Sequence, residues 1–170
     1  MSTAQDILIR PIEPGDDIAE LTKLLHRSYA ILGARGWNYT AVDQTVAVTQ
    51  DRLADGAGLV AVDRAGRIVG TITYWPPEKS FDSPWLRRPD VALLGQFAVE
   101  PSWQKRGVGA RLMAAVENMA RAAGARELAL DTAEPARHLV DWYTRCGYRF
   151  IEHAQWNGKR YRSVIMSKTL

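Results

Sequence analysis

The chain has 170 residues and a formal net charge of +3, with 46% hydrophobic and 24% charged residues. This composition is that of an ordinary globular protein, and its 22 basic residues are spread along the chain, which permits an anionic ligand without requiring nucleic acid. The single cysteine, Cys146, excludes an internal disulfide, and no apolar run approaches the length of a membrane span. The N-terminus also lacks the basic and apolar segments of a leader. We therefore expect one cytoplasmic domain over residues 1–170, with no nucleic-acid or membrane partner.

Hydrophobic periodicity in the first half predicts a strand, two helices and a hairpin. Asp17 and Glu20 have the spacing of a capping box at the start of the first helix. The apolar face of that helix carries Ile18, Leu21, Leu25 and Tyr29. The predicted elements are a strand at 7–12, helices from residue 18 and over 42–53, and strands at 59–63 and 68–75 that are joined at Ala65-Gly66. Residues 76–89 contain four prolines and are predicted to be a loop.

The second half alternates strands and helices and closes with a hairpin. Its last two strands flank Asn157-Gly158, a strong turn dipeptide. The predicted elements are a strand at 91–99, a helix from near Gly109 to Gly124, a strand at 127–131, a helix at 136–146, and strands at 148–152 and 159–168. The whole order is βααβββαβαββ, with no internal repeat.

A glycine loop, Gln104-Lys105-Arg106-Gly107-Val108-Gly109, lies between the strand at 91–99 and the helix that follows it. The first turn of a helix carries unpaired N–H groups and partial positive charge, so an anion is stabilised there. Glycine allows the backbone to approach closely and to adopt positive φ. The loop therefore predicts a site for phosphate oxygens.

Three phosphate-binding patterns compete for this loop. The P-loop requires Gly-Lys-Ser/Thr at its end, and Ala110 and Arg111 exclude it. A dinucleotide fingerprint fits the order strand, glycines, helix, strand and then Asp131, but its third glycine falls on Leu112. The pyrophosphate loop of coenzyme A acyltransferases, Gln/Arg-x-x-Gly-x-Gly/Ala, is matched at every fixed position by Gln104, Gly107 and Gly109.

The chain resembles the GNAT superfamily of N-acetyltransferases over residues 91–170, whereas the first half matches only in the order of its elements. Three further segments carry the likeness: a central strand that ends in Val99-Glu100-Pro101, a Tyr143-to-Gly147 signature followed by Tyr148 where Phe is usual, and a closing strand at 161–170. One departure is Ala136, because many relatives carry Asn seven residues before the signature Tyr. This change removes a side-chain contact to the cofactor and leaves the backbone cradle intact.

The resemblance implies an α/β (α+β) fold, the acyl-CoA N-acyltransferase fold, with a mixed and mostly antiparallel splayed sheet flanked by helices. Acetyl-CoA, as co-substrate without a metal, would lie in the splay, with its pantetheine arm bonded to free backbone groups of Phe97 and Val99. Lys105, Arg106 and Arg111 are natural partners for its phosphates. The residues expected to bind the cofactor are Phe97, Ala98, Val99, Gln104, Lys105, Arg106, Gly107, Val108, Gly109 and Ala110.

Acetyl transfer to an amine requires a base, an oxyanion donor and an acid. An alkylamine of pKa about 10.4 is neutral roughly once in 2,500 at pH 7, which costs about 4.6 kcal/mol. Glu100 is our first candidate for the base that offsets this cost, with Asp131, Glu134, His138 and water as alternatives. The resemblance assigns oxyanion stabilisation to a backbone N–H near Val99. It assigns protonation of the leaving thiolate to Tyr143.

We therefore expect an acetyl-CoA-dependent N-acetyltransferase that acts by direct transfer in a ternary complex. A non-catalytic acyl-CoA-binding or sensor module and a dinucleotide-binding protein are the alternatives. The acceptor is a small-molecule or peptide amine, and the oligomeric state is open between a monomer and a homodimer. Arg87 and Arg88 suggest an acidic feature on the acceptor. Its expected surface is aromatic, comprising Tyr29, Trp37, Tyr39, Trp75 and Trp85.

Overall fold

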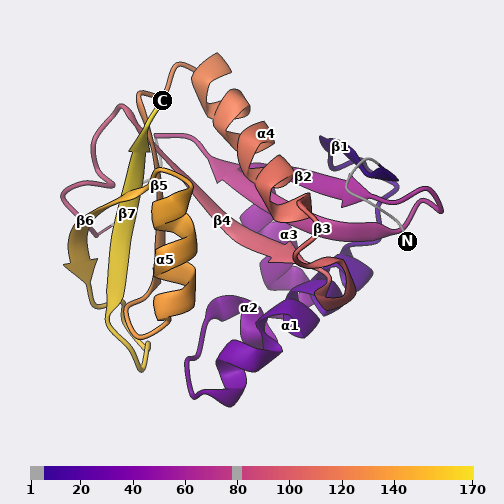
Figure 1. The fold of residues 1–170 in the computed structure, drawn as a ribbon, viewed down its shortest axis with the longest axis horizontal. Helices are drawn as coiled ribbons and strands as arrows, with labels where there is room; N and C mark the ends of the chain where they lie inside the picture. Colours follow the sequence, from indigo (N-terminus) through magenta and orange to yellow (C-terminus); the bar gives the residue numbers. More distant parts are fainter. Residues whose placement is uncertain (1–5, 78–81) are drawn as a thin grey trace.

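The structure, a computed structural model, describes residues 6–77 and 82–170. The chain contains helices and strands in mixed order (Figure 1). The first half contains β1 (Leu8–Pro11), α1 (Ile18–Ala34), α2 (Thr40–Asp43), α3 (Val46–Ala54), β2 (Ala57–Val62) and β3 (Ile68–Trp75). The second half contains β4 (Val91–Val99), a 3-10 turn (Pro101–Trp103), α4 (Val108–Ala122), β5 (Glu127–Ala133), α5 (Arg137–Arg145), β6 (Arg149–Ala154) and β7 (Ser163–Thr169).

The strands form one sheet in the order β1-β2-β3-β4-β5-β7-β6, and every neighbouring pair is antiparallel except β4 and β5. The parallel pairing of β4 with β5 covers three residue pairs and ends at Leu93 and Ala129. The six residues of β4 after Leu93 therefore have no ladder partner on that side. Figure 1 shows the two strands moving apart from this point. The predicted fold, a mixed and mostly antiparallel splayed sheet with flanking helices, is confirmed.

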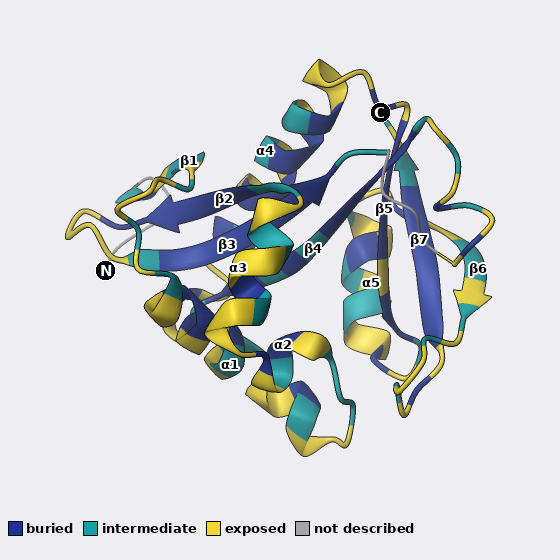
Figure 2. Cartoon of the chain, turned by 180° about the vertical axis from the view of Figure 1, so that it is seen from behind, coloured by how far each residue is buried: buried dark blue, intermediate teal, exposed yellow. Residues whose placement is uncertain are grey.

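Helices cover both faces of the sheet. α4 packs on one face against β2, β3 and β4, and α1 and α3 pack on the opposite face (Figures 1 and 2). The inward stripe of α4 follows a helical period and consists of Val108, Leu112, Met113, Val116 and Ala120. None of the helices in the described part of the chain is long and apolar enough to cross a membrane.

The predicted single helix over 42–53 is wrong, because the chain forms two helices there. Gln44 has an extended backbone (ψ 143°), which ends α2. Thr45 then caps α3 by accepting a hydrogen bond from the Val48 N–H. The predicted capping box of α1 is half formed. Asp17 accepts from the Glu20 N–H, whereas the Glu20 carboxylate accepts from Arg27.

Two other segments differ from their predicted form or coverage. The final strand begins at Ser163 instead of residue 159, because Asn38 bonds the chain just before it through Lys159 Nζ and the Arg160 N–H. The predicted proline loop at 76–89 lies partly outside the described residues, at 78–81. In the described part of this loop, the Leu86 side chain is buried.

A buried carboxylate joins the last three strands of the sheet. Glu127 of β5 accepts hydrogen bonds from Arg149 of β6 (3.0 Å) and from Ser167 (2.7 Å) and Thr169 (2.8 Å) of β7. Burial alone would raise the pKa of this carboxyl, but these donors outweigh it and hold the pKa below its usual value. The ionised form is therefore bound more tightly in the folded protein than in the unfolded chain.

We expect Glu127→Gln to lower the free energy of unfolding near neutral pH by about 1–3 kcal/mol, because it weakens a charged hydrogen-bond cluster. Since the folded pKa is depressed, this contribution is present above the unfolded pKa of about 4.3 and is lost as the pH falls through the folded pKa. Urea unfolding at pH 7 and in acid measures the effect. Glu13→Gln, at an exposed carboxylate, is the control. An equal difference in free energy of unfolding between Glu127→Gln and the wild-type protein at both pH values would contradict the depressed pKa of Glu127.

Candidate active site

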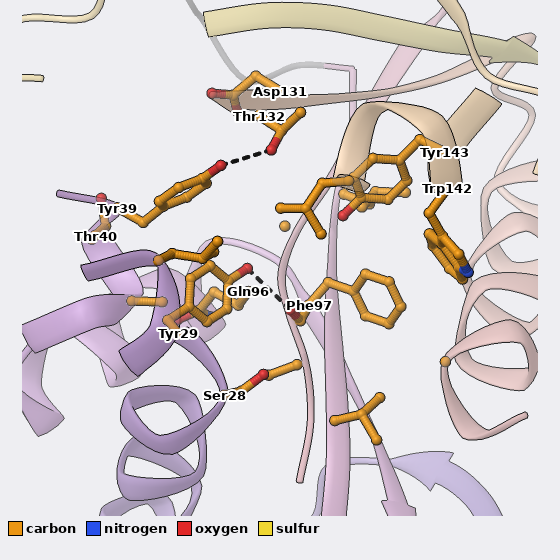
Figure 3. A pocket seen from close by; sticks show the side chains of 18 of the residues that line it. Ser28, Tyr29, Tyr39, Thr40, Gln96, Phe97, Asp131, Thr132, Trp142 and Tyr143 are labelled. Atoms are coloured by element: carbon orange, nitrogen blue, oxygen red, sulfur yellow. Dashed lines mark hydrogen bonds between the residues drawn. The ribbon is translucent and has the colours of Figure 1, made fainter. Parts of the chain in front are cut away.

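A cavity of about 660 Å³ lies where β4 and β5 separate. Its walls come from α1, α2, β4, β5, α5 and the glycine loop (Figure 3). Sequence-distant aromatic side chains face one another across it, with Tyr29 and Tyr39 on one side and Trp142 and Tyr143 on the other. The splay of the sheet therefore creates a single space that several elements can reach.

The glycine loop closes one end of the cavity. Gly107 is the N-cap of α4 with a φ of +83°, and it has no side chain that could accept from the first-turn N–H groups. Gln104 Nε2 donates to the Val99 carbonyl at 3.1 Å and so fixes the loop on the end of β4. A Cβ on Gly109 would lie 3.4 Å from Phe97 Cζ, so a larger side chain at this position would fill the space beside the strand. These features fit a phosphate-bearing ligand.

Eight of the ten residues predicted to bind the cofactor line the cavity. They are Phe97, Ala98, Val99, Gln104, Lys105, Gly107, Gly109 and Ala110. The other two, Arg106 and Val108, do not line it. The Val108 side chain is buried in the core, because it begins the inward stripe of α4. The Arg106 guanidinium lies over the Trp103 ring, 5.3 Å from its centroid.

A β-bulge shapes the wall that β4 presents to the cavity. Thr71 pairs with Ala98 and Thr73 with Gly95, so Gln96 and Phe97 together lie opposite Ile72. Gln96 has a φ of +44°, which is unusual for a residue with a Cβ. Its side-chain oxygen accepts from Gln44 Nε2 (2.7 Å), and its amide donates to Thr73 (3.2 Å). This buried network stabilises the bulge.

The backbone carbonyls at the bulge are less open than the sequence suggested. The Tyr29 hydroxyl donates to the Phe97 carbonyl at 3.0 Å, and Gln104 already occupies the Val99 carbonyl. The sequence predicted that the backbone groups of Phe97 and Val99 are free. This prediction is wrong in part, because each carbonyl already accepts one hydrogen bond from a side chain. A carbonyl oxygen has two lone pairs, so each retains a second acceptor position.

Tyr143 extends from α5 into the cavity, and Figure 3 shows its hydroxyl pointing toward the central space. The residue is 9% exposed, and its hydroxyl forms no hydrogen bond with any residue of 6–77 or 82–170. Burial and the nearby Tyr29, Tyr39 and Asp131 raise the pKa of this phenol well above its usual value. The hydroxyl therefore remains protonated and has no acceptor within the described structure.

Asp131, on β5, is the one carboxylate among the described residues that line the cavity, and in Figure 3 it lies next to Thr132 at the edge of the group. Trp156 Nε1 (2.9 Å) and Ser163 Oγ (3.3 Å) both donate to its Oδ2, which leaves Oδ1 without a hydrogen bond to any described residue. No described cation lies within ion-pair distance. Desolvation by the surrounding protein raises the pKa of Asp131, opposed by these two donors and by Arg52 and Lys159.

The other candidate acids and bases are placed differently. Glu100 does not line the cavity, because its carboxylate forms a two-pronged ion pair with Arg27 of α1 (3.1 and 2.8 Å). Glu134 is bound by Arg162 at 2.8 Å and by His153 at 3.2 Å, and Arg162 foremost lowers the pKa of Glu134 to about 2. His138 lines the cavity and is exposed on α5. The structure thus places Asp131 and Tyr143 in the wall of one cavity and leaves Glu100 out of that wall.

The predicted acceptor surface is only partly present. Tyr29 and Tyr39 line the large cavity, and Trp75 borders a smaller recess. Trp37 and Trp85 line neither, and Arg88 is paired with Asp90 instead. The cavity residues that the sequence analysis missed include Arg52, Trp156, Lys159 and Tyr161. Arg52 and Lys159 lie 107 positions apart, and no local pattern marks either as part of a site.

An open sheet, a glycine loop at the start of a helix and a cavity between the separating strands have the architecture of the acyltransferase class. Residues 18–148 match the family model described as Acetyltransferase (GNAT) family. The match covers most of the chain, so the protein belongs to this family and is an N-acetyltransferase.

Similar proteins support the same class. The chain is 27% identical over 159 residues, 91% of both chains, to S-(2-succino)cysteine N-acetyltransferase of Bacillus subtilis. Among solved structures, it superposes with a GNAT family acetyltransferase from Elizabethkingia anophelis with acetyl-CoA bound, with a TM-score of 0.69, 18% identity and coverage of 97% and 99%. A GCN5-related N-acetyltransferase from Rhodopseudomonas palustris gives a TM-score of 0.73 at 24% identity, with coverage of 100% and 99%. At these identities the structures establish the fold.

Proposed function

We propose that the protein transfers an acetyl group from acetyl-CoA to a primary amine by direct attack in a ternary complex. The observation that carries this proposal is one continuous cavity that contains the glycine loop, the hydroxyl of Tyr143 and the open oxygen of Asp131. The loop would hold the donor, and the two side chains would serve the two proton movements of the reaction.

The glycine loop and the open side of β4 would bind the donor. The first-turn N–H groups of α4, next to Lys105, would bind the pyrophosphate, and the backbone from Phe97 to Val99 would bind the pantetheine arm. When bound, the donor supplies an activated thioester. We place the oxyanion donor at a backbone N–H near Val99, as the family resemblance implies.

Asp131 would act as the base. The amine nitrogen attacks the carbonyl carbon, the carbon–sulfur bond breaks, and the nitrogen must lose one proton. The unbonded Oδ1 of Asp131 can accept that proton directly or through water. Desolvation raises its pKa, which makes the ionised form a better proton acceptor than an ordinary carboxylate. Glu100 is held by Arg27 and does not line the cavity, so we prefer Asp131.

Tyr143 would assist the departing thiolate. A thiol of pKa about 8.5 is already a fair leaving group, so the contribution is moderate. The Tyr143 hydroxyl is protonated, desolvated and without an acceptor among the described residues, so it can donate to the sulfur as negative charge develops there. The proton passes to the sulfur and is later replaced from solvent. S-(2-succino)cysteine, the acceptor in the name of the Bacillus relative, is one amine to test.

We expect acetyl-CoA, but not NAD, to raise the melting temperature by several degrees at about 100 times its Kd. Gly109→Val should remove most of this shift, because its side chain would fill the space beside Phe97 and Val99. Gly15→Val is the matched control, because nothing lies within 4 Å of a Cβ there. A thermal-shift titration measures both. An unchanged shift in Gly109→Val would place the donor elsewhere, and a shift with NAD alone would favour a dinucleotide-binding protein.

A further inference from the structure

We propose that the acceptor is a compact amino acid whose carboxylate is bound by Arg52 while its amine lies at Asp131. This inference rests on the proposed acetyl transfer and names the substrate class of the same cavity. Three charged side chains carry it, because each faces the cavity and each is held by neutral partners alone. They are Arg52, Asp131 and Lys159.

Arg52 is a partly buried guanidinium without a carboxylate partner. It projects from α3 with its guanidinium carbon 5.3 Å from the centroid of the Trp75 ring. Its Nη1 donates to Gln44 Oε1 at 3.0 Å, and no carboxylate of the described residues lies within 4 Å of it. Burial lowers the pKa of this group, but a guanidinium still remains charged. A desolvated cation that lacks an anion is stabilised strongly by a ligand that brings one.

The guanidinium is also held in a fixed orientation. Gln44, its acceptor, is itself anchored because its Nε2 donates to Thr49 and Gln96 at 2.7 Å each. The aromatic face of Trp75 supports the plane of the guanidinium. A guanidinium with free N–H groups in a fixed plane fits the two oxygens of a carboxylate. Little conformational entropy would be lost when such a ligand binds.

A recess of about 200 Å³ adjoins the main cavity and places a negative group in the same wall as Arg52. It is bounded by Arg52, Asp55, Trp75, Asp131 and the β4 residues Leu93–Gly95. A Cβ on Gly95 would lie 2.6 Å from the Trp75 ring and 3.6 Å from Arg52 Nη2, so glycine is needed to leave this wall open. The recess has one cation and two carboxylates, and of these Arg52 and Asp131 also line the main cavity. That pair complements the two charges of a zwitterion.

Lys159 adds a second positive group to the acceptor end of the cavity. Its Nζ donates to the Asn38 carbonyl (2.7 Å) and to Thr40 (3.1 Å), and no described carboxylate is within ion-pair distance of it. Burial lowers the pKa of this amine, opposed by Asp131. At the acceptor end of the main cavity, the two positive charges of Arg52 and Lys159 exceed the one negative charge of Asp131. This balance disfavours a polyamine and favours an acceptor that carries an acid group.

The test compares amino acids with their carboxamides, which have the same amine and lack the carboxylate. We expect Arg52→Gln to lower the ratio of kcat/KM for acid over amide by about 10- to 100-fold, mainly through KM, because a charged hydrogen-bonded pair is lost. Comparing the ratio between proteins cancels the intrinsic reactivity of each amine. Arg52→Lys should recover part of the loss. Arg121→Gln, an exposed change at the end of α4, should leave the ratio unchanged.

Folding and donor binding are checked separately by the thermal shift that acetyl-CoA produces in each variant. A full shift in Arg52→Gln together with an unchanged acid-to-amide ratio would overturn the inference and leave the proposed transfer standing. Preference of the wild-type protein for polyamines or neutral alkylamines would also overturn it. Failure of every amine, acids included, would instead remove the proposed acetyl transfer itself. If Arg52→Gln does not fold, Lys159→Gln and the wild-type acid-to-amide ratio decide the question.

Discussion

Asp131→Asn should lower kcat/KM for amine acetylation by about 100- to 1,000-fold while making the folded protein more stable near neutral pH. The activity falls because asparagine cannot accept the amine proton. Its carbonyl can still accept from Trp156 and Ser163, so the wall of the cavity is retained. Steady-state thiol release and urea unfolding of the same protein samples measure the two effects.

The gain in stability follows from the raised pKa of Asp131, which desolvation by the surrounding protein causes although the residue is exposed at the cavity. A group whose folded pKa is raised contributes stability below its unfolded pKa of about 3.9, and this contribution is lost as the pH rises through the folded pKa. Near neutral pH the ionised carboxylate therefore lowers the free energy of unfolding, and the amide does not. The acid limb of the wild-type pH–rate profile should lie above pH 3.9 and be absent from Asp131→Asn.

Glu100→Gln is the matched comparison. It neutralises the carboxylate that follows β4, which the sequence analysis favoured as the base. We expect it to retain most of the activity, since Glu100 is paired with Arg27 and does not line the cavity. Equal losses in the two variants would implicate both groups. A large loss in Glu100→Gln with full activity in Asp131→Asn would restore Glu100 as the base.

Tyr143→Phe should lower kcat by about 100-fold with little change in the binding of acetyl-CoA. The change removes one hydroxyl that has no hydrogen-bond partner in residues 6–77 and 82–170, so it leaves no orphaned protein group behind. The ring would still pack against Trp142 and Tyr148. Pre-steady-state and steady-state thiol release with a good acceptor, measured across pH, determine the loss.

Tyr148→Phe controls for the loss of a tyrosine hydroxyl as such. The Tyr148 hydroxyl contacts Met113 and Glu117 in the core and does not line the cavity, so its removal should affect stability more than kcat. Thiol release by Tyr143→Phe at the wild-type rate over the whole pH range would show that Tyr143 is not the acid. Water in the cavity would then be the proton donor to the thiolate.

Local signals in the sequence predicted much of the sheet. The bounds of β3 and β4 are those expected, because continuous apolar runs bordered by turn residues define them. The prediction of one helix over 42–53 was wrong because the hydrophobic period of the sequence continues across Gln44 and Thr45, where the structure has a break. The break depends on tertiary contacts, since the buried Gln44 side chain joins α3 to β4. Periodicity does not report such a polar contact.

Most of the residues predicted to bind the cofactor line the cavity, whereas Arg52 and Lys159 of the acceptor site proposed above were not predicted from the sequence. Residues 104–109 are contiguous, and their glycine spacing states a backbone requirement that sequence records directly. Glu100 was preferred because it follows the strand, but Arg27, 73 residues earlier, holds its carboxylate elsewhere. Arg52 and Lys159 converge with Asp131 only through the fold. The proposal depends on the neutral hydrogen-bond partners of Arg52 and Lys159 among the described residues, and only the three-dimensional structure identifies those partners.

The central claim, acetyl transfer from a donor bound in the splay to an amine beside Asp131, is tested most directly by one measurement. Initial rates of thiol release from acetyl-CoA are recorded over a panel of amino acids, their amides and other amines, with mass spectrometry of each acceptor. We predict one thiol released per N-acetyl group formed, with rates that depend on both substrates together, as a ternary complex requires. Stabilisation by acetyl-CoA without any acetylated amine across the panel would contradict the claim and identify a non-catalytic acyl-CoA-binding module.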